Sequence, residues 1–399
     1  MSKDHVVILG GARTPIGGFQ GVFSNTAAPA LGVAAARAAL ERAGLNPSDN
    51  DSCIDDVLMG CVLPAGLAQA PARQVALGAG LAVTTPCTTV NKMCGSGMKT
   101  VMMGVDQILA GNADTVLAGG IENMTLAPYL IPKARGGLRL GHGELKDHMF
   151  LDGLEDAYTG RLMGSFAQET ADKHGLTRKD MDDYAIASLS RAQTAIKEGW
   201  FDAESVSLDV KAGRNDITVT HDEQPGKASV DKIPTLRPAF AADGTVTAAN
   251  SSSISDGAAA VVLMRESVAR DNNLKPMARI LAQASHARHP SEFTVAPIGA
   301  IEKVLTKTGW SAADVDLFEI NEAFAMVPLL AMRELGLPHD KVNIHGGACA
   351  LGHPVGASGT RIIVTLMYAL QKLGKKRGIA SLCIGGGEAV AIAIEMIDQ

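Results

Sequence analysis

Residues 88–97 read Thr88-Thr89-Val90-Asn91-Lys92-Met93-Cys94-Gly95-Ser96-Gly97 and join two kinds of regular structure. The β-branched residues at the start favour a strand, and residues 98–109 that follow have the apolar spacing of a helix. A strand that passes into a helix through a glycine turn is typical of α/β proteins. The stretch therefore predicts an α/β fold with Cys94 at a strand-to-helix junction.

Cys94 is a candidate nucleophile because of this position. Unpaired backbone N–H groups and the positive end of a helix dipole favour a thiolate, so we expect the pKa of Cys94 to be lowered. The neighbouring glycines leave room for a substrate to reach the sulfur. From these residues alone, a buried cysteine beside a structural turn remains an equal alternative.

Composition narrows the class of protein. A chain of 399 residues that is 46% hydrophobic is long enough for two domains. The net charge of -6 argues against nucleic acid or an anionic membrane as the partner. No apolar run approaches the roughly 20 residues of a membrane span. The chain starts without a leader-like segment and ends without a peroxisomal or retention tail, so we expect a cytoplasmic protein with six free cysteines.

One order of elements occurs twice. Each copy has a helix, a strand, a second helix, a second strand and a glycine doublet or triplet. The first copy comprises residues 31–43, 56–59, 98–111 and 115–120, and the second comprises residues 299–308, 316–320, 359–374 and 379–387. This repeat predicts two similar α/β halves, each with strands covered on both faces by helices.

The region between the repeats has a different texture. Residues 132–148 are rich in glycine and charge, and residues 178–198 have the pattern of a polar helix. We expect an insertion at about residues 123–246, packed on the first half, before the strand pattern resumes at residues 258–264. The predicted domains are residues 1–270, which include this insertion, and residues 272–399.

Three more glycine-rich segments follow predicted strands or open predicted helices, where open α/β sheets place ligand sites. They contain Asn321, His353 with Cys349, and Cys383 with Gly385. A histidine can accept the proton of a thiol and then stabilise the product, which suits Cys94. Structural alternatives are open for each: Asn321 as a helix cap, Cys383 as an inert core thiol, and His353 as a packed side chain.

Other chemistries fit the residues less well. The glycine-rich segments match neither G-x-G-x-x-G nor the P-loop, so a nucleotide site is weakly supported. Cys349 and His353 offer two zinc ligands, but their partners lack the spacing of a metal site. Cys94, His353 and Asn321 have the residue types of a papain-like hydrolase, although that leaves Cys383 without a role.

The four segments resemble the signature segments of the thiolases, in the order of that family. They are V-N-K-M-C-G-S-G at 90–97, N-E-A-F-A at 321–325, G-G-A-C-A-L-G-H-P-V-G-A-S-G at 346–359 and C-I-G-G-G at 383–387. Residues 244–252 resemble the family segment that meets the pantetheine arm of coenzyme A, and residues 11–17 match as well. The resemblance covers essentially the whole chain.

The resemblance implies a five-layer αβαβα fold of two similar halves with an inserted loop domain, in a homotetramer or homodimer. It also implies that two acetyl-CoA molecules condense reversibly to acetoacetyl-CoA and CoA, with acyl-CoA thioesters as substrates and no permanently bound cofactor or metal. Such an enzyme serves fatty-acid metabolism. A broader 3-ketoacyl-CoA thiolase is the alternative within the class, and a non-catalytic acyl-CoA-binding or lipid-binding protein is the alternative from another class.

The resemblance also assigns roles to residues. Cys94 would be acylated, His353 would take its proton, and Cys383 would remove the α-proton of the second acetyl-CoA. Asn321 would hold a water beside His353, and the backbone N–H groups of Cys94 and Gly385 would form an oxyanion hole. The positions that would contact coenzyme A are Ser252, Phe240, Met163 and Phe324.

Several positions depart from the family pattern. Glu388 stands where a smaller or neutral residue is usual, and Leu162 where a histidine is common. Residues 293–297 replace a usual Met-Gly-x-Gly-Pro, and Cys349 stands where isoleucine is common. These departures leave the preferred acyl chain length open.

Overall fold

The structure is a computed structural model that describes residues 4–47, 53–212 and 215–398. The expectations about a leader and a C-terminal tail rest partly on Met1, Ser2, Lys3 and Gln399, which lie outside the described residues. All six cysteines are described and are free thiols. No helix among the described residues is long and apolar enough to cross a membrane.

The first half of the chain builds one mixed sheet. Its strands, in spatial order, are β4 (Cys87–Val90), β3 (Asp56–Gly60), β5 (Thr115–Asn123), β10 (Ser255–Arg265) and β1 (Val6–Arg13). The β4–β3 and β3–β5 pairs are parallel, whereas β5–β10 and β10–β1 are antiparallel. The two-residue strand β2 (Gly17–Gly18) pairs antiparallel with the first two residues of β10. Strands β1 and β5 are buried along their whole length, as expected for strands with helices on both faces.

The second half repeats this pairing. Its strands are β12 (Leu317–Ile320), β13 (Arg377–Ile384), β14 (Glu388–Met396) and β11 (Ala278–Ala287). The β12–β13 pair is parallel, and β13–β14 and β14–β11 are antiparallel. A parallel bridge from Phe318 to Val342 occupies the place that β4 has in the first half. The repeat predicted from the sequence therefore extends to sheet topology, and β1–β11 pairing joins the two sheets edge to edge.

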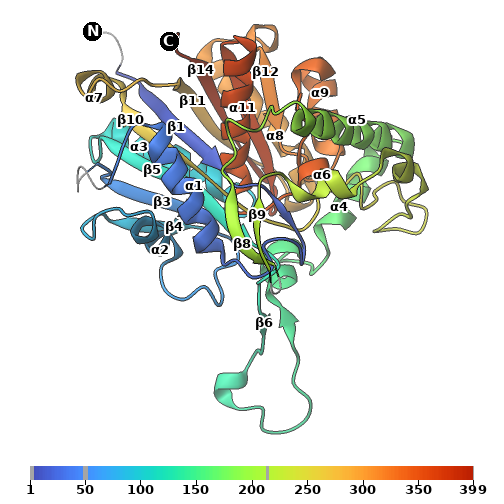
Figure 1. The fold of residues 1–399 in the computed structure, drawn as a ribbon. Coiled ribbons are helices and arrows are strands. Elements are labelled where there is room, and N and C mark those ends of the chain that lie inside the picture. Colours follow the sequence, from blue (N-terminus) through green and yellow to red (C-terminus); the bar gives the residue numbers. More distant parts are fainter. Residues whose placement is uncertain (1–3, 48–52, 213–214, 399) are drawn as a thin grey trace.

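Helices form three layers around the two sheets (Figure 1). Helices α1 (Ala28–Arg42) and α2 (Pro71–Gly78) cover the outer face of the first sheet, and α8 (Ala296–Thr308) and α9 (Met326–Leu335) cover that of the second. Helices α3 (Ser96–Ala110) and α11 (Ser358–Leu373) share one core between the sheets. The short helix α7 (Glu266–Asp271) follows β10. The predicted αβαβα order is confirmed.

The segment between β5 and β10 contacts both halves. It contains β6 (Tyr129–Leu130), β7 (Lys146–Asp147), α4 (Met163–Lys173), α5 (Arg178–Lys197), β8 (Leu208–Ala212), β9 (Asn215–Val219) and α6 (Glu223–Lys227). Strands β8 and β9 pack on the core of the first half. Helix α5, however, packs against the short helix α10 (Ala348–Leu351) of the second half. The insertion therefore packs on the first half, and α5 in addition carries polar side chains that bind loops of the second half.

Short helical turns complete the chain, and two of them matter for the site. The turn η3 (Val230–Thr235) precedes the segment around Phe240, and η4 (Pro290–Val295) precedes α8. The others are η1 (Ala134–Gly136), η2 (Phe150–Leu154), η5 (Ala312–Asp314) and η6 (His339–Lys341).

Helices α3 and α11 begin in contact because glycines remove the side chains between them. A Cβ atom on Gly359 would lie 2.3 Å from the backbone nitrogen of Met98, and one on Gly97 would lie 2.9 Å from that of Thr360. Gly120, in β5, would meet the carbonyl oxygen of Gly356 at 2.1 Å. These approaches bring the first turns of both central helices to one place, at the carboxyl end of β5.

Candidate active site

The turn that carries Cys94 is held by its own polar groups. The Ser96 hydroxyl accepts a hydrogen bond from the Lys92 N–H at 2.8 Å and donates one to the Met93 carbonyl at 2.6 Å. Met93 lies in the left-handed region with φ of 48°, which is uncommon for a residue with a side chain. The turn therefore presents Cys94 just ahead of α3, whose N-cap is Gly95.

Two backbone N–H groups point at the sulfur of Cys94, those of Gly385 and of Cys94 itself. Both lower the pKa of the thiol, but burial has the larger effect and raises it. The expected lowering of the Cys94 pKa is therefore wrong. The helix terminus was identified correctly, and the loss of water around the sulfur outweighs it.

Cys383 lies near the end of β13, buried and close enough to Cys94 for their charges to interact. Burial raises the pKa of Cys383 well above that of a free thiol, and the proximity of Cys94 raises it further. Both thiols are therefore neutral in the resting protein. Two cysteines 289 positions apart in the chain are thus close enough for one to raise the pKa of the other.

His353 is buried in the loop between α10 and α11, and its neighbours define which ring nitrogen carries the proton. Nδ1 lies 2.6 Å from the hydroxyl of Ser358, and this hydroxyl donates its hydrogen to the Pro354 carbonyl at 2.9 Å. Since a hydroxyl has one hydrogen, Nδ1 must be the donor toward Ser358. Nε2 is then left without a proton and can act as an acceptor.

Asn321 and Arg361 complete the surroundings of His353. The Asn321 amide nitrogen lies 3.5 Å from Nε2 of His353, and its oxygen lies 3.5 Å from the Arg361 guanidinium. Burial, with the positive charge of Arg361, lowers the pKa of His353 to about 3, so the imidazole is neutral at physiological pH. Asn321 is not the cap of α9, because the N-cap is Ala325.

Packing and backbone contacts connect these groups to Cys94. Val355, two residues after His353, belongs to the apolar cluster that Cys94 packs against. The backbone N–H of Asn321 donates to the Ser381 carbonyl of β13 at 3.0 Å, two residues before Cys383. Contacts thus link Cys94 with Gly385 and Cys383, and Asn321 with His353, and neighbouring residues connect the two groups.

Two buried carboxyl groups that sequence reasoning missed hold these loops. Glu122 accepts the N–H groups of Val62, Leu63 and Gly356 at 2.9 to 3.1 Å, and burial raises its pKa to about 7. Glu322 accepts the hydroxyls of Tyr184 and Ser188, the Asn343 amide and the Cys349 N–H. The sequence did offer a signal for both residues, because Glu122 and Glu322 are single acidic residues within apolar or glycine-rich segments.

The residues expected to contact coenzyme A border the same region. The Ser252 N–H donates to the Ala323 carbonyl at 2.9 Å, which ties residues 244–252 to the segment of Asn321. The rings of Phe240 and Phe324 pack edge to face with centroids 6.4 Å apart. The Met163 sulfur lies 3.4 Å from the point that a Cβ on Gly385 would occupy.

The departures from the family pattern occupy defined places. Phe293 is buried with its ring 6.2 Å from that of Phe324, and Leu162 is the N-cap residue of α4. The Cys349 thiol contacts the Glu322 carbonyl oxygen at 3.6 Å, as a small packed side chain would. Glu388 forms an ion pair with Lys92.

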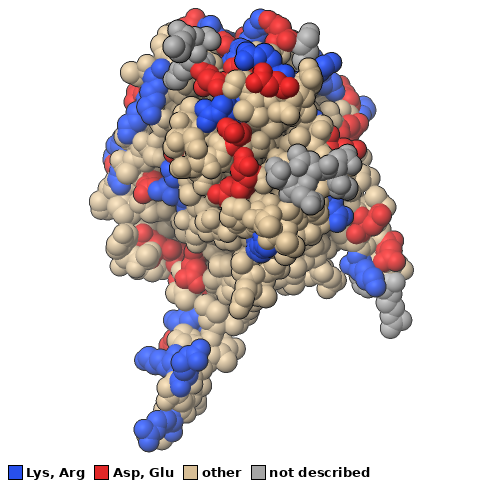
Figure 2. All heavy atoms as spheres, turned by 90° about the vertical axis from the view of Figure 1, so that its left-hand side faces the viewer, with Lys and Arg blue, Asp and Glu red and all other residues tan. Residues whose placement is uncertain are grey.

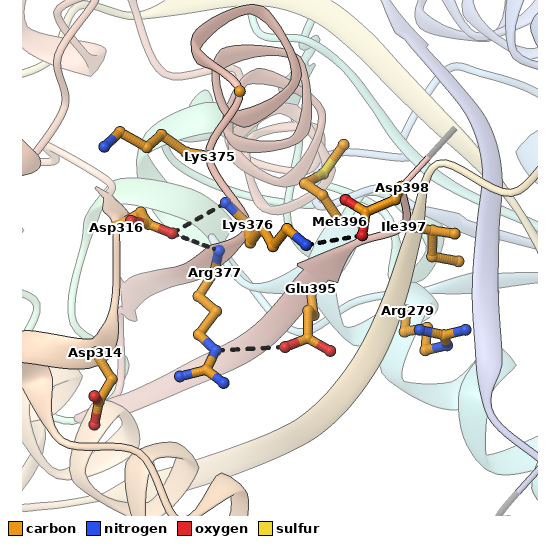
Figure 3. A pocket seen from close by; sticks show the side chains of 11 residues that line it. Arg279, Asp314, Asp316, Lys375, Lys376, Arg377, Glu395, Met396, Ile397 and Asp398 are labelled. Atoms are coloured by element: carbon orange, nitrogen blue, oxygen red, sulfur yellow. Dashed lines mark hydrogen bonds and ion pairs between the residues drawn. The ribbon is translucent and has the colours of Figure 1, made fainter.

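A large open hollow lies elsewhere, at the opposite end of β13. Its volume is about 680 Å³, and Figure 3 shows that charged side chains line it. Lys376 pairs with Asp398 and Arg377 with Glu395, so these charges neutralise one another. It opens at Arg377, six residues before Cys383, or about 20 Å along an extended strand. Among the described residues, no His, Cys, Asp and Glu side chains are grouped so that they could hold a metal ion.

Two family descriptions match consecutive parts of the chain. "Thiolase, N-terminal domain" matches residues 6–267, and "Thiolase, C-terminal domain" matches residues 274–396. The chain belongs to the thiolase family.

Curated thiolases resemble this one over its full length. It is 45% identical over 399 residues, the whole of both chains, to "Acetyl-CoA acetyltransferase" of Schizosaccharomyces pombe. It is also 45% identical over 391 residues to the protein of that name from Pseudomonas aeruginosa, with 98% of each chain covered.

Solved thiolase structures share the fold. Acat5 thiolase from Ascaris suum, solved in complex with coenzyme A, superposes with a TM-score of 0.93 at 41% identity, covering 99% of this chain and 100% of its own. The Bacillus anthracis acetyl-CoA acetyltransferase superposes with a TM-score of 0.95 at 38% identity, covering 99% of each chain.

Proposed function

We propose that this thiolase condenses two acetyl-CoA molecules to acetoacetyl-CoA and free CoA, reversibly, through an acyl-cysteine. The observation that carries the proposal is the pair of interacting thiols, of which Cys94 faces the Gly385 N–H, together with a neutral imidazole whose Nε2 carries no proton. Full-length similarity to proteins named acetyl-CoA acetyltransferase supports the choice of substrate. CoA thioesters are its substrates, and no bound cofactor is needed.

In the first half-reaction the Cys94 sulfur attacks the carbonyl carbon of acetyl-CoA while its proton moves to Nε2 of His353. The tetrahedral oxyanion accepts hydrogen bonds from the N–H groups of Cys94 and Gly385. As the bond from carbon to the CoA sulfur breaks, the proton on Nε2 passes to that sulfur, and CoA leaves as a thiol. Since both partners start neutral, no isolated charge persists in this buried site.

In the second half-reaction the Cys383 thiol, which is neutral at rest, passes its proton to Nε2 of His353, and the thiolate so formed removes an α-proton from a new acetyl-CoA. The enolate oxygen is held by His353, protonated at Nε2, and by a water on Asn321. The enolate carbon attacks the acetyl-cysteine, the bond to the Cys94 sulfur breaks, and acetoacetyl-CoA forms. The departing Cys94 thiolate takes the proton from Nε2 of His353, so that both cysteines end as thiols and the imidazole is neutral again. Each donor to such an oxyanion contributes about 3–4 kcal/mol, which is why several donors converge.

The rings beside the site favour a short acyl group. Phe240, Phe324 and Phe293 pack edge to face next to Met163, which borders Gly385. We infer that bulky rings at this point narrow the space for a long acyl chain. This crowding supports the acetyl substrate over the broader 3-ketoacyl alternative.

Steady-state assays test the proposal. We expect acetoacetyl-CoA to form from acetyl-CoA alone, and kcat/KM for thiolysis to fall steadily from four-carbon to twelve-carbon 3-ketoacyl-CoA substrates. A flat or rising profile would favour the broader enzyme. Binding of CoA thioesters without any turnover would favour the non-catalytic alternative.

We also propose a homotetramer built as a dimer of dimers, with a homodimer as the alternative. An arm, residues 126–147, projects from the molecule (Figures 1 and 2). It carries exposed apolar side chains that gain nothing from water. They are Leu126, Tyr129, Ile131, Leu138, Leu140 and Leu145, and Leu140 is fully exposed. Burial against a second dimer would account for them.

The cytoplasmic location and the place in fatty-acid metabolism are also proposed. The place in metabolism follows from the substrate class, because acetyl-CoA and acetoacetyl-CoA are formed and consumed in the breakdown and synthesis of acyl chains, and the cytoplasmic location stays a prediction from the sequence. Cell fractionation with an antibody to this protein tests the location. Recovery in the membrane fraction would contradict it.

A further inference from the structure

An ion pair connects the two turns that supply the groups around the Cys94 sulfur. Lys92 lies two residues before Cys94, and Glu388 lies three residues after Gly385. Their side chains form a hydrogen-bonded ion pair, with exposed fractions of 29% and 36%. The two residues come from different halves of the molecule and are 296 positions apart.

The turn of Gly385 is closed by the pairing of Ile384 with Glu388, but its glycines offer no side chains to hold it against the Cys94 turn. It contains three consecutive glycines, and a Cβ on Gly386 would find no atom within 4 Å. Gly386 and Gly387 have φ of +95° and +91°, in the region that favours glycine. On one side the Gly387 carbonyl accepts the Arg288 N–H at 2.7 Å. Toward Cys94, the Ile384 side chain packs beside Gly95, and Glu388, the first residue of β14, adds the charged connection to Lys92.

The turn of Cys94 is rigid by comparison. Besides the Ser96 contacts, the Met93 N–H donates to the Asn91 side-chain oxygen at 2.9 Å. Lys92 therefore projects from a well-held backbone. Its ion pair restrains the Glu388 carboxylate relative to the Cys94 turn. The N–H of Gly385 stays aimed at the Cys94 sulfur only while the two turns keep this relative position.

We propose that Lys92 and Glu388 are a positioning pair that fixes the Gly385 N–H relative to the Cys94 sulfur, and so tunes the rate of acyl transfer. The inference rests on the proposed function. It gives a purpose to Glu388, which departs from the family pattern. Neither side chain touches the reacting atoms, and their effect passes through the backbone of the two turns.

A competing interpretation makes Lys92 a contact for a phosphate of coenzyme A. Its charge is already neutralised by Glu388, which disfavours this role. The two interpretations differ in kinetics. A phosphate contact acts on KM for CoA substrates, whereas a positioning pair acts on kcat, because the donor is needed most in the transition state.

Charge exchange provides the test. We expect Lys92→Met and Glu388→Gln each to lower kcat by about five- to tenfold, with KM for acetyl-CoA within about twofold of wild type. The reversals Lys92→Glu and Glu388→Lys should lower kcat further. The double variant K92E/E388K should recover kcat to within about threefold of wild type, because the pair re-forms with opposite polarity.

Controls separate this proposal from the proposed function. Lys376→Met, which removes the distant pair with Asp398, should leave kcat unchanged. Thermal midpoints of all variants are compared, so that a kcat loss is assigned only to folded protein. If wild type fails to acetylate Cys94, the proposed function is wrong. If wild type is active but the double variant is no faster than the reversals, or the single variants change KM alone, the positioning role is wrong.

Discussion

At the scale of single residues, burial determines the charges in this site. Cys94 has two N–H groups aimed at its sulfur and still has a raised pKa. Cys383 and His353 are shifted in the same sense, toward their neutral forms. The resting site is therefore a set of neutral groups that exchange one proton when a thioester arrives. This avoids the large cost of holding an ion pair away from water.

The depressed pKa of His353 predicts a pH dependence of stability. Below about pH 6.5 the unfolded chain binds a proton at this histidine, while the folded protein does not until about pH 3. Because the unfolded state binds more protons between pH 6.5 and 3, the free energy of unfolding falls as pH falls through this range, by about 1.4 kcal/mol per pH unit. We expect the free energy of unfolding of wild type, relative to His353→Asn, to fall between pH 6.5 and 4 in chemical denaturation. A constant difference would show that His353 titrates normally.

The tautomer of His353 predicts the effect of Ser358→Ala. Without the hydroxyl, Nδ1 loses its acceptor and the form with a proton on Nε2 is no longer disfavoured. We expect kcat to fall at least about tenfold, because Nε2 must be free to accept the thiol proton. Ser311→Ala, which removes the cap of a distant short helix, is the matched control. Equal kcat for both variants would contradict the assigned tautomer.

At the scale of elements, local sequence patterns predicted the helices and strands well. They predicted very little about the contacts between elements that are distant in the chain. The turn at Cys94, the helix that follows it and the repeated order of strands and helices all depend on neighbouring residues, and α3 begins within two residues of the expected start. Spacing alone did not reveal that α5 binds the second half. That contact depends on Tyr184 and Ser188 meeting Glu322 more than 130 positions away.

The candidate site was predictable in its chemistry and not in its electrostatics. Cys94, His353 and Cys383 stand in glycine-rich segments whose composition is visible in the sequence. Their pKa shifts follow from burial by residues of both halves, which no short segment encodes. Ser358 and Arg361 were missed for the same reason, since their importance lies in which side chain they face.

The contact between α3 and α11 predicts a sharp steric effect. A methyl group on Gly359 would overlap the backbone of Met98, which cannot move without shifting the helix that follows Cys94. We expect Gly359→Ala to lower the free energy of unfolding by about 1–3 kcal/mol or more in urea titration. Gly226→Ala, where the added methyl meets no atom within 4 Å, should be neutral or slightly stabilising. Equal effects would mean that the helices are not in contact.

At the scale of the whole molecule, the site lies where two similar halves meet. Cys94 comes from the first half, and His353, Asn321 and Cys383 come from the second. The β1–β11 pairing and the shared core of α3 and α11 fix the halves against each other. Each of the two similar halves thus contributes one cysteine to the place where they meet.

The projecting arm predicts a loss of assembly. We expect replacement of residues 131–145 by a short glycine-containing turn to leave a folded dimer that still turns over acetyl-CoA. The arm carries exposed apolar side chains and does not contribute Cys94, Cys383 or His353. Light scattering coupled to size exclusion measures the change. An unchanged tetramer would show that assembly uses another surface.

The central claim is that Cys94 receives the acyl group and Cys383 acts only afterwards. Intact-mass spectrometry of wild type, Cys94→Ala and Cys383→Ala after mixing with acetyl-CoA tests it directly. The account predicts one added acetyl group on wild type and on Cys383→Ala, none on Cys94→Ala, and no acetoacetyl-CoA from either variant. An acetyl group on Cys94→Ala, or condensation at the wild-type rate by Cys383→Ala, would contradict it.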